Sequence, residues 1–324
     1  MVIDKSNMKQ VLQDFPKQCR EALTLAQGLK VQGEFNNIMV CGMGGSGLGG
    51  DILKAYLMES SSLPVYVVKD YEIPAYINEN TLVFAVSYSG NTEETLSALT
   101  KAKNKGAKVV AITSGGQLLD LVDTVITVPS GLQPRNAAAY LFFPIIGVLF
   151  NSGLIEVKNQ DLNEMINVLK DTQYFEEKGK ELALKIKNKM PVIYSSSRLS
   201  PVAFRFKCEI NENSKHPACY HVFPELCHNE LVGYSGMERA KFIVIMIRDN
   251  GDHERIKKRM DTCKNLFEET VDVEEMTTLG DSLLARIFSA IYLGDWVSYH
   301  LAVWKRIDPT PVHVIENLKN ALKD

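Results

Sequence analysis

The sequence has no excess of basic residues. Lys and Arg number 36 and Asp and Glu number 39, which gives the 324-residue chain a formal net charge of -3 at pH 7. Proteins that bind nucleic acid need a positive patch or stripe to neutralise the phosphates. We therefore expect no nucleic-acid partner, and no basic helix-turn-helix segment stands near the start of the chain.

Long apolar runs are also missing. The most apolar stretch, residues 138–150, is too short to span a bilayer and contains Pro144. The opening residues, MVIDKSNMKQ, lack the apolar core of a secretory signal. These features predict a protein that neither crosses a membrane nor carries a signal for export.

The six cysteines form no disulfide-rich pattern, and most of them stand in apolar segments. We therefore expect reduced thiols in a cytoplasmic protein. Five side chains of metal-ligating type stand close together, but they lack the paired C-x-x-C or H-x-x-x-H spacing of a zinc site. We expect no metal at these residues, which are His216, Cys219, His221, Cys227 and His228.

The chain is long enough for two globular domains, and its 45% hydrophobic and 23% charged residues are ordinary for such a protein. In the first half, short runs rich in Val and Ile alternate with helix-like segments at 51–60 and 92–106. Continuous apolar strands that alternate with helices predict a doubly wound α/β domain with a parallel sheet. The expected strands are 37–41, 65–69, 82–87, 108–113 and 124–129.

The second half repeats this alternation. A buried helix is expected at 137–150, and polar linker helices follow within 155–188. The expected strands then lie at 190–196, 241–249 and 270–276. The expected helices lie at 200–213, 252–267 and 281–304. This pattern predicts a second α/β domain, and we divide the chain into domains at 1–152 and 153–324.

A glycine-rich loop, 39-MVCGMGGSGLGGD-51, follows the first expected strand. Gly42, Gly44 and Gly47 fit the pattern G-x-G-x-x-G. Glycines let the backbone approach an anion, and the following helix presents its first N–H groups to it, so phosphate binding is expected. A dinucleotide site would also need an acidic residue near the end of the second strand. Asp70 is a loose match, so this alternative stays open here.

The third strand ends in 87-SYSGNTEET-95, which places three hydroxyls, those of Ser87, Ser89 and Thr92, where a helix begins. Ser46 of the first loop is expected in the same crevice at the carboxyl edge of the sheet. An ordinary N-cap needs one hydroxyl, whereas an uncharged phosphate cradle needs several. Two such loops favour phosphate binding over a dinucleotide.

Further side chains are candidates for chemistry. Arg135 follows a proline after the fifth strand, and a guanidinium there can stabilise a developing oxyanion. Glu212 stands near a helix end, with Glu209 one turn earlier, and a carboxylate is a suitable base beside a carbonyl. His228, in a His-Asn-Glu tripeptide, can move a proton near neutral pH. Lys319 stands on an amphipathic final helix. Taken singly, Arg135 is better explained as a surface arginine. The plain alternatives for the others are a solvated helix end for Glu212, a loop histidine for His228 and a solvated lysine for Lys319.

The two loops resemble those of the sugar isomerase (SIS) domain, in which G-[MI]-G-G-S-G precedes S-x-S-G-x-T-x-E. That domain is similar to a flavodoxin-type sheet and binds phosphosugars. From Gly42 to Lys319 the order and spacing of the motifs resemble the bifunctional phosphoglucose/phosphomannose isomerase family, within the phosphoglucose isomerase superfamily. The matching stretches are CGMGGSG, SYSGNTEE, QPRNA, the E-I-N-E-N-[SA]-K run, HNE and the final helix after DP.

The resemblance implies two SIS-type domains and an aldose–ketose isomerase that interconverts glucose 6-phosphate and mannose 6-phosphate with fructose 6-phosphate. Glu212 would move a proton between C2 and C1, and Arg135 would hold the cis-enediolate. His228 and Lys319 would assist ring opening. The histidine comes from the partner subunit in this family, which implies a homodimer with shared sites and no cofactor. The implied phosphate ligands are Gly45, Ser46, Ser87, Ser89 and Thr92.

One position departs from the family's pattern. Related isomerases often have Gln or Thr about seven residues before the final lysine, where this chain has Val312, with Thr310 and His313 adjacent. This leaves open which group lies near C2. Three other functions remain as alternatives: a phosphosugar sensor without catalysis, an amidotransferase-like isomerase, and a dinucleotide-dependent oxidoreductase. The amidotransferase would need an N-terminal nucleophilic cysteine, which this chain lacks.

Overall fold

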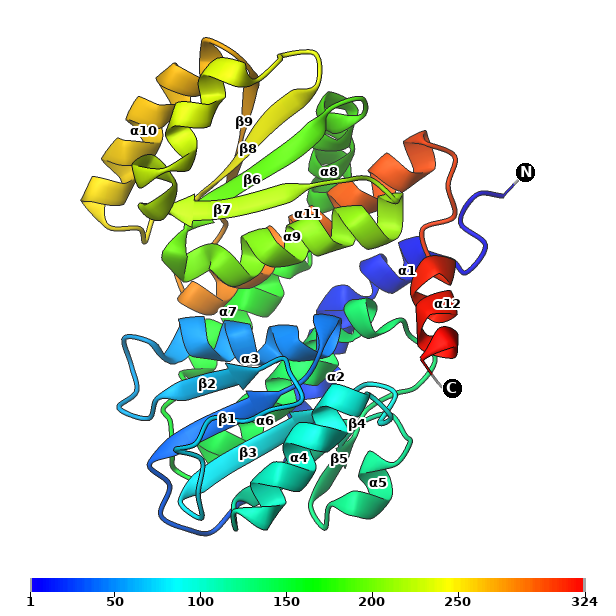
Figure 1. The fold of residues 1–324 in the computed structure, drawn as a ribbon, viewed down its shortest axis with the longest axis vertical. Coiled ribbons are helices and arrows are strands. Elements are labelled where there is room, and N and C mark those ends of the chain that lie inside the picture. The colour runs from blue at the N-terminus through cyan, green and yellow to red at the C-terminus, as the bar shows by residue number, and fades with distance from the viewer. Residues whose placement is uncertain (1, 323–324) are drawn as a thin grey trace. The chain divides into compact units, whose positions relative to one another are not determined.

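The computed structural model describes residues 2–322 of the chain (Figure 1). These residues form two compact units. Residues 14–166 make up the first unit, and residues 2–13 together with 167–322 make up the second. Residues 153–166 thus group with the first unit, whereas the sequence-based division was placed after residue 152. The assignment of two SIS-type domains to 1–152 and 153–324 stays a prediction.

The first unit contains a five-stranded parallel sheet with the strand order β2-β1-β3-β4-β5. This is the order of the flavodoxin-like doubly wound fold. Every residue of β1 and β3 is buried, as expected for strands that helices cover on both faces. The five expected strands are confirmed as Asn37–Cys41 (β1), Val65–Val68 (β2), Thr81–Val86 (β3), Lys108–Thr113 (β4) and Val125–Thr127 (β5).

Helices pack on both faces of this sheet (Figure 1). On one face, Met39 and Val83 belong to a buried cluster with Leu99 of α4. On the other face α3 lies so close to β1 that a Cβ on Gly50 would be 2.8 Å from the Cβ of Val40. The expected buried helix is confirmed as α6. The helices are Phe15–Thr24 (α2), Gly44–Leu57 (α3), Glu93–Asn104 (α4), Leu118–Leu121 (α5), Ala138–Asn151 (α6) and Asn159–Leu169 (α7), and the last three residues of α7 belong to the second unit.

The second unit contains a four-stranded parallel sheet with the order β7-β6-β8-β9. The edge strand β7 was not among the expected strands. Its first residues, Cys219 and Tyr220, are exposed, and His221 follows them, so it has no continuous apolar run. The strands are Met190–Ser196 (β6), Cys219–Phe223 (β7), Phe242–Arg248 (β8) and Asp272–Thr277 (β9).

Helices also cover both faces of the second sheet (Figure 1). On one face, Met260 and Phe267 of α10 join a buried cluster with Val192 and Val244 of the sheet. On the other, α11 packs against α8 and α9. The short helix α1 belongs here, because the Tyr292 hydroxyl donates to the Leu12 carbonyl (2.8 Å). The helices are Met8–Gln13 (α1), Thr172–Ile186 (α8), Ser200–Ser214 (α9), Glu254–Glu268 (α10), Leu283–Trp304 (α11) and His313–Ala321 (α12).

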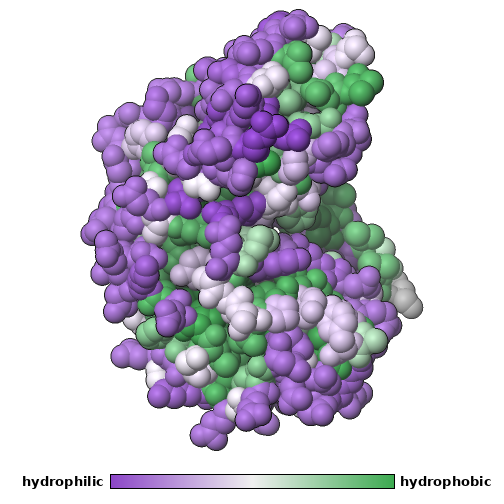
Figure 2. Space-filling view, turned by 90° about the vertical axis from the view of Figure 1, so that its left-hand side faces the viewer, coloured by the Kyte–Doolittle hydropathy of each residue, from purple (hydrophilic) through white to green (hydrophobic). Residues whose placement is uncertain are grey.

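Hydrophilic side chains predominate on the face of the molecule drawn in Figure 2, and hydrophobic ones occur in smaller groups among them. Within residues 2–322, none of the helices combines the length and the apolar composition that crossing a lipid bilayer requires.

Candidate active site

The glycine loop closes the turn from β1 into α3. The helix starts at Gly44, inside the loop, and not at residue 51 as expected. A Cβ on Gly42 would lie 2.7 Å from the Val86 carbonyl oxygen, and one on Gly47 would lie 2.4 Å from the Gly42 carbonyl oxygen. The side chain of Met43, the N-cap residue of α3, makes no capping hydrogen bond. The glycines therefore let α3 begin tight against β3, with its first N–H groups not occupied by a cap.

A buried hydrogen bond joins this loop to the next one. The backbone N–H of Tyr88 donates to Ser46 Oγ over 3.2 Å, and Ser46 is 5% exposed. Ser46 lies in the first turn of α3, and Tyr88 follows the end of β3. The structure thus brings the two predicted phosphate loops together at the carboxyl edge of the first sheet.

The second loop places its hydroxyls at the start of α4. Ser87 Oγ lies 2.8 Å from Thr92 Oγ1, and the N–H of Asn91 donates to Ser89 Oγ (3.3 Å). Thr92 is the N-cap residue of α4, but its side chain makes no capping hydrogen bond. A second helix N-terminus therefore presents uncapped N–H groups beside neutral hydroxyls, an arrangement that favours an anion.

Arg135 belongs to the same edge of the sheet. It lies in the 3₁₀ helix η1 (Pro134–Ala137), is 3% exposed, and its Nη1 donates to Gln133 Oε1 (3.4 Å). Gly45 packs directly on it, because a Cβ there would lie 2.9 Å from the backbone N of Arg135. The five predicted phosphate ligands and Arg135 are therefore neighbours.

Sequence reasoning missed a residue that holds this arrangement. The Tyr88 hydroxyl donates to the Pro129 carbonyl (2.7 Å) and accepts from the Leu132 N–H (2.9 Å). These two bonds tie the segment before Arg135 to the loop after β3. Burial raises the pKa of Tyr88 above its ordinary value, so the phenol keeps its proton. The position of Tyr88 between Ser87 and Ser89 is the sequence feature that could have indicated this role.

In the second unit, Glu212 lies in the last turn of α9 and lines a pocket of about 500 Å³. Lys215 shapes this pocket, because its Nζ donates to the carbonyls of Asp308 and Pro309, each at 3.0 Å. These bonds bring the chain before α12 against the end of α9. The remaining wall is largely apolar and includes Ile307, Pro311, Val312, Val314 and Ile315.

Glu209, one turn earlier, is buried in the protein interior. Its carboxylate is 2% exposed, pairs with Arg205 (3.0 Å) and accepts from Asn213 Nδ2 (2.9 Å). Arg205 also pairs with the buried Asp295 (2.9 Å), and these two carboxylates raise the pKa of the guanidinium against the opposing effect of its burial. Of the two neighbouring glutamates, only Glu212 lines the pocket.

Hydrogen bonds fix the direction of α9 along the second sheet. At its start, Ser197 Oγ donates to the Phe223 carbonyl at the carboxyl end of β7 (3.0 Å). Just past its end, His216 Nε2 lies 2.9 Å from the Lys189 carbonyl, immediately before β6. The helix therefore runs from the carboxyl edge of the sheet to the amino edge.

Glu212 and His228 consequently lie at opposite edges of the second sheet. Glu212 is twelve residues beyond Ser200, roughly 18 Å along the helix axis. His228 ends the 3₁₀ helix η3 (Glu225–His228), which follows β7 at the carboxyl edge, and it is exposed. The structure does not bring these two residues together within one copy of the chain.

Lys319 lies on α12, which starts at the wall of the Glu212 pocket. Val312 is the N-cap residue of α12 and lines that pocket, as do His313 and Ile315. Lys319 is nearly two turns further along and is exposed. Val312, the position that departs from the family's pattern, is therefore closer to Glu212 than its place in the sequence indicates.

The cysteine and histidine residues at 216–228 do not converge. Cys219 is exposed on β7, and His221 Nε2 is 4.0 Å from Glu230 Oε2. Across the described chain, no three His, Cys, Asp or Glu side chains are grouped as metal ligands.

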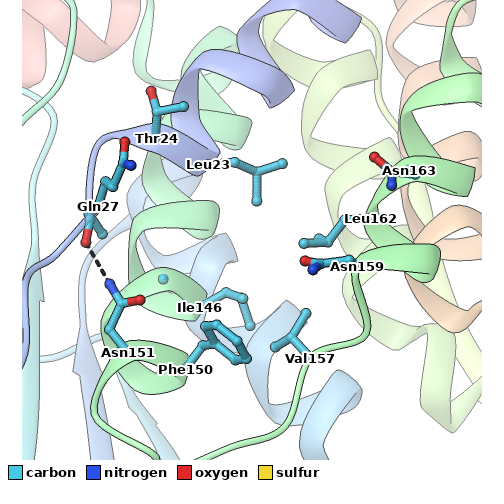
Figure 3. A pocket seen from close by; sticks show the side chains of 12 residues that line it. Leu23, Thr24, Gln27, Ile146, Phe150, Asn151, Val157, Asn159, Leu162 and Asn163 are labelled. Carbon is cyan, nitrogen blue, oxygen red and sulfur yellow. Dashed lines mark hydrogen bonds between the residues drawn. The ribbon is translucent and has the colours of Figure 1, made fainter.

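A second pocket of about 500 Å³ lies within the first unit, among α2, α6 and α7 (Figure 3). Apolar side chains such as Leu23, Phe150 and Leu162 line it, together with the amides of Gln27 and Asn159. It contains no charged residue and none of the predicted site residues, so its chemistry does not suit a phosphate.

Both halves of the chain match known protein families. A model described as SIS domain matches residues 34–143, and one described as bacterial phospho-glucose isomerase C-terminal SIS domain matches residues 175–322. The C-terminal domain of glucosamine-fructose-6-phosphate aminotransferase from Francisella tularensis shares the fold, with a TM-score of 0.77 at 16% identity over 94% of this chain and 98% of that one.

Closer relatives match along almost the whole length. The bifunctional phosphoglucose/phosphomannose isomerase of Caldicellulosiruptor bescii is 43% identical over 96% of this chain and 97% of its own. The protein of the same name from Aquifex aeolicus is 39% identical over 89% of this chain and 91% of its own. The chain belongs to the bifunctional phosphoglucose/phosphomannose isomerase family.

Proposed function

We propose that this protein interconverts glucose 6-phosphate and mannose 6-phosphate with fructose 6-phosphate. Relatives with 43% and 39% identity carry the name of that activity. The observation that carries the proposal in the structure is the pairing of two uncapped helix N-termini through the bond between Ser46 and Tyr88. This pairing offers neutral hydroxyls and N–H groups to a phosphate dianion.

In the proposed reaction the phosphate anchors the open-chain sugar. Ser46, Ser87, Ser89 and Thr92 supply hydroxyls, and Gly45 lets the backbone come close. Glu212 removes the proton from C2 and returns it to C1. The proton is acidic because it is next to the sugar's own carbonyl, so a carboxylate suffices as the base. The buried Arg135 guanidinium stabilises the negative charge of the cis-enediolate.

We propose a homodimer in which His228 acts in the partner's site. Support comes from the second unit, where His228 and Glu212 lie at opposite edges of one sheet. A histidine that assists ring opening has to reach the sugar oxygen directly or through one water. A second copy can supply His228 to the Glu212 of the first, and Lys319 assists the same step from α12.

The experiment that tests the function is isomerisation in EDTA. Purified protein receives fructose 6-phosphate, and glucose 6-phosphate and mannose 6-phosphate are quantified separately. Both products are expected. Glucose 6-phosphate alone would contradict the bifunctional activity and direct attention to Val312. Phosphosugar binding without either product would favour a sensor.

We also propose a cytoplasmic location. All six cysteines are free thiols, a state that a reducing compartment maintains. Cell fractionation tests this directly, because the protein should be found in the cytoplasmic fraction.

A further inference from the structure

Two cysteines of the second unit lie in contact. Cys227 Sγ is 3.8 Å from Cys263 Sγ, although the two residues are 36 positions apart in the sequence. Cys227 lies on η3, directly before His228, and Cys263 lies on α10. No other sulfur pair makes such a contact among residues 2–322.

The surroundings hold the two sulfurs near each other. Cys263 is 4% exposed within the buried cluster that covers one face of the second sheet, and Cys227 packs against that cluster. Leu226, next to Cys227, is fully buried in it. A disulfide needs a sulfur–sulfur distance of about 2.05 Å, so the pair has to close by roughly 1.8 Å. A short 3₁₀ helix on the surface of a core can move by this amount more readily than a strand within it.

The two thiols differ in reactivity. Cys227 is partly exposed, so a small oxidant can reach its sulfur. Burial and the neighbouring Cys227 raise the pKa of Cys263 to about 12, so this residue stays protonated. Cys227 is therefore the residue that reacts first, and Cys263 is the resolving residue.

We propose that Cys227 and Cys263 form a reversible disulfide when the protein meets a hydroperoxide. The Cys227 thiolate attacks the peroxide, the O–O bond breaks, and a sulfenic acid and an alcohol or water are formed. The Cys263 thiol then attacks the sulfenic sulfur, the S–S bond forms, and water leaves. Two thiols lose two electrons, and the hydroperoxide gains them.

The disulfide has a consequence for catalysis, which rests on the proposed role of His228. Closing the pair draws η3 toward α10 and displaces the backbone of the adjacent His228. Misplacement of a catalytic group by about 1 Å can cost on the order of 100-fold in rate. We expect oxidation to lower kcat at least tenfold, and a dithiol reductant to restore it.

To test this, the 324-residue protein is treated with hydrogen peroxide, the remaining thiols are alkylated, and linked peptides are identified by mass spectrometry. The expected product links Cys227 to Cys263 and accumulates together with the loss of kcat. Cys263→Ala should block both effects, and Cys227→Ala serves as a second variant if the first does not fold. Cys219→Ala, which removes an exposed thiol, should leave both effects intact.

Three outcomes would overturn the inference: no link between the two residues, a link that forms while kcat is unchanged, or loss of activity that persists in the Cys263→Ala protein. Failure of the proposed function is distinguishable, because the reduced protein would then lack isomerase activity while the peptide analysis would still report the disulfide.

Discussion

At the residue scale, Glu209 and Glu212 illustrate how the surroundings decide the role of a side chain. Both are glutamates of α9, one turn apart. Glu209 is enclosed by Arg205 and Asn213, whereas Glu212 lines a pocket beside Val312. A catalytic base has to be accessible to its substrate, which suits Glu212. A buried carboxylate has to stay paired with its cation, as Glu209 is with Arg205.

Substitution of each glutamate should therefore have a different effect. Glu212→Gln should lower kcat by about 10²–10⁴-fold because the base is lost, while phosphosugar binding and thermal stability are retained. Glu209→Gln should instead cost about 3–5 kcal/mol of unfolding free energy, because the buried Arg205 loses one charged partner. Kinetics and thermal melts of both variants test this. An active Glu212→Gln protein would remove Glu212 from the role of base.

The hydroxyls of the second loop should contribute to affinity. Ser87→Ala removes a buried hydroxyl 2.8 Å from that of Thr92. A hydrogen bond to a charged group is worth about 1.5–3 kcal/mol, so we expect Kd for the phosphosugar to rise roughly 10–100-fold. Ser97→Ala is the control. Ser97 lies on α4, but outside its first turn, and its Oγ donates to the Tyr71 carbonyl. Equal affinities for the two variants, measured by calorimetry, would exclude Ser87 as a phosphate ligand.

At the scale of elements, a side chain ties the segment 129–135 to the loop after β3. Tyr88→Phe removes the hydrogen bonds to Pro129 and Leu132 but retains the ring. Arg135 is then held less firmly, so we expect kcat to fall by about tenfold with a smaller change in KM, and the unfolding free energy to fall by about 1–3 kcal/mol.

Tyr66→Phe is the matched control for this substitution. The Tyr66 ring lies 4.5 Å from that of Tyr76, and its hydroxyl forms no hydrogen bond with any residue of 2–322. If the Tyr88 and Tyr66 variants had the same kcat, Tyr88 would not position Arg135.

The elements differ in how far the sequence predicts them. The strands of the first sheet are predictable because burial on both faces makes them continuous apolar runs. The edge strand β7 is not, since only part of it is buried. The start of α3 was placed too late because glycines disfavour a helix locally, and close packing against β1 and β3 overrides that preference.

The candidate site is predictable only in its local parts. The sequence predicts that one loop contains Ser87, Ser89 and Thr92, because these residues are neighbours along the chain. The distinction between Glu209 and Glu212 depends on Asp295 and Ser298, which are distant in the sequence and belong to a buried network around Arg205. The contact between Cys227 and Cys263 likewise arises only when η3 packs on α10.

At the scale of the whole molecule, the proposed shared site predicts complementation between inactive proteins. Glu212→Gln and His228→Ala are each expected to be almost inactive as homodimers. When equal amounts are unfolded and refolded together, half of the dimers should be mixed, and each mixed dimer contains one intact site. Recovery of about a quarter of the wild-type activity is expected. A mixture no more active than its components would contradict a site completed by the partner.

The central claim is that a proton moves between C2 and C1 through the carboxylate of Glu212. The most direct measurement is to convert fructose 6-phosphate in D₂O and to determine deuterium at C2 of the glucose 6-phosphate and mannose 6-phosphate formed. We predict partial deuterium at C2 of both products with the wild-type protein, because the proton held by Glu212 exchanges with solvent in a fraction of turnovers, and no labelled product above background with Glu212→Gln. Deuterium at C2 that forms equally fast with Glu212→Gln would show that another group moves the proton and would contradict this role of Glu212.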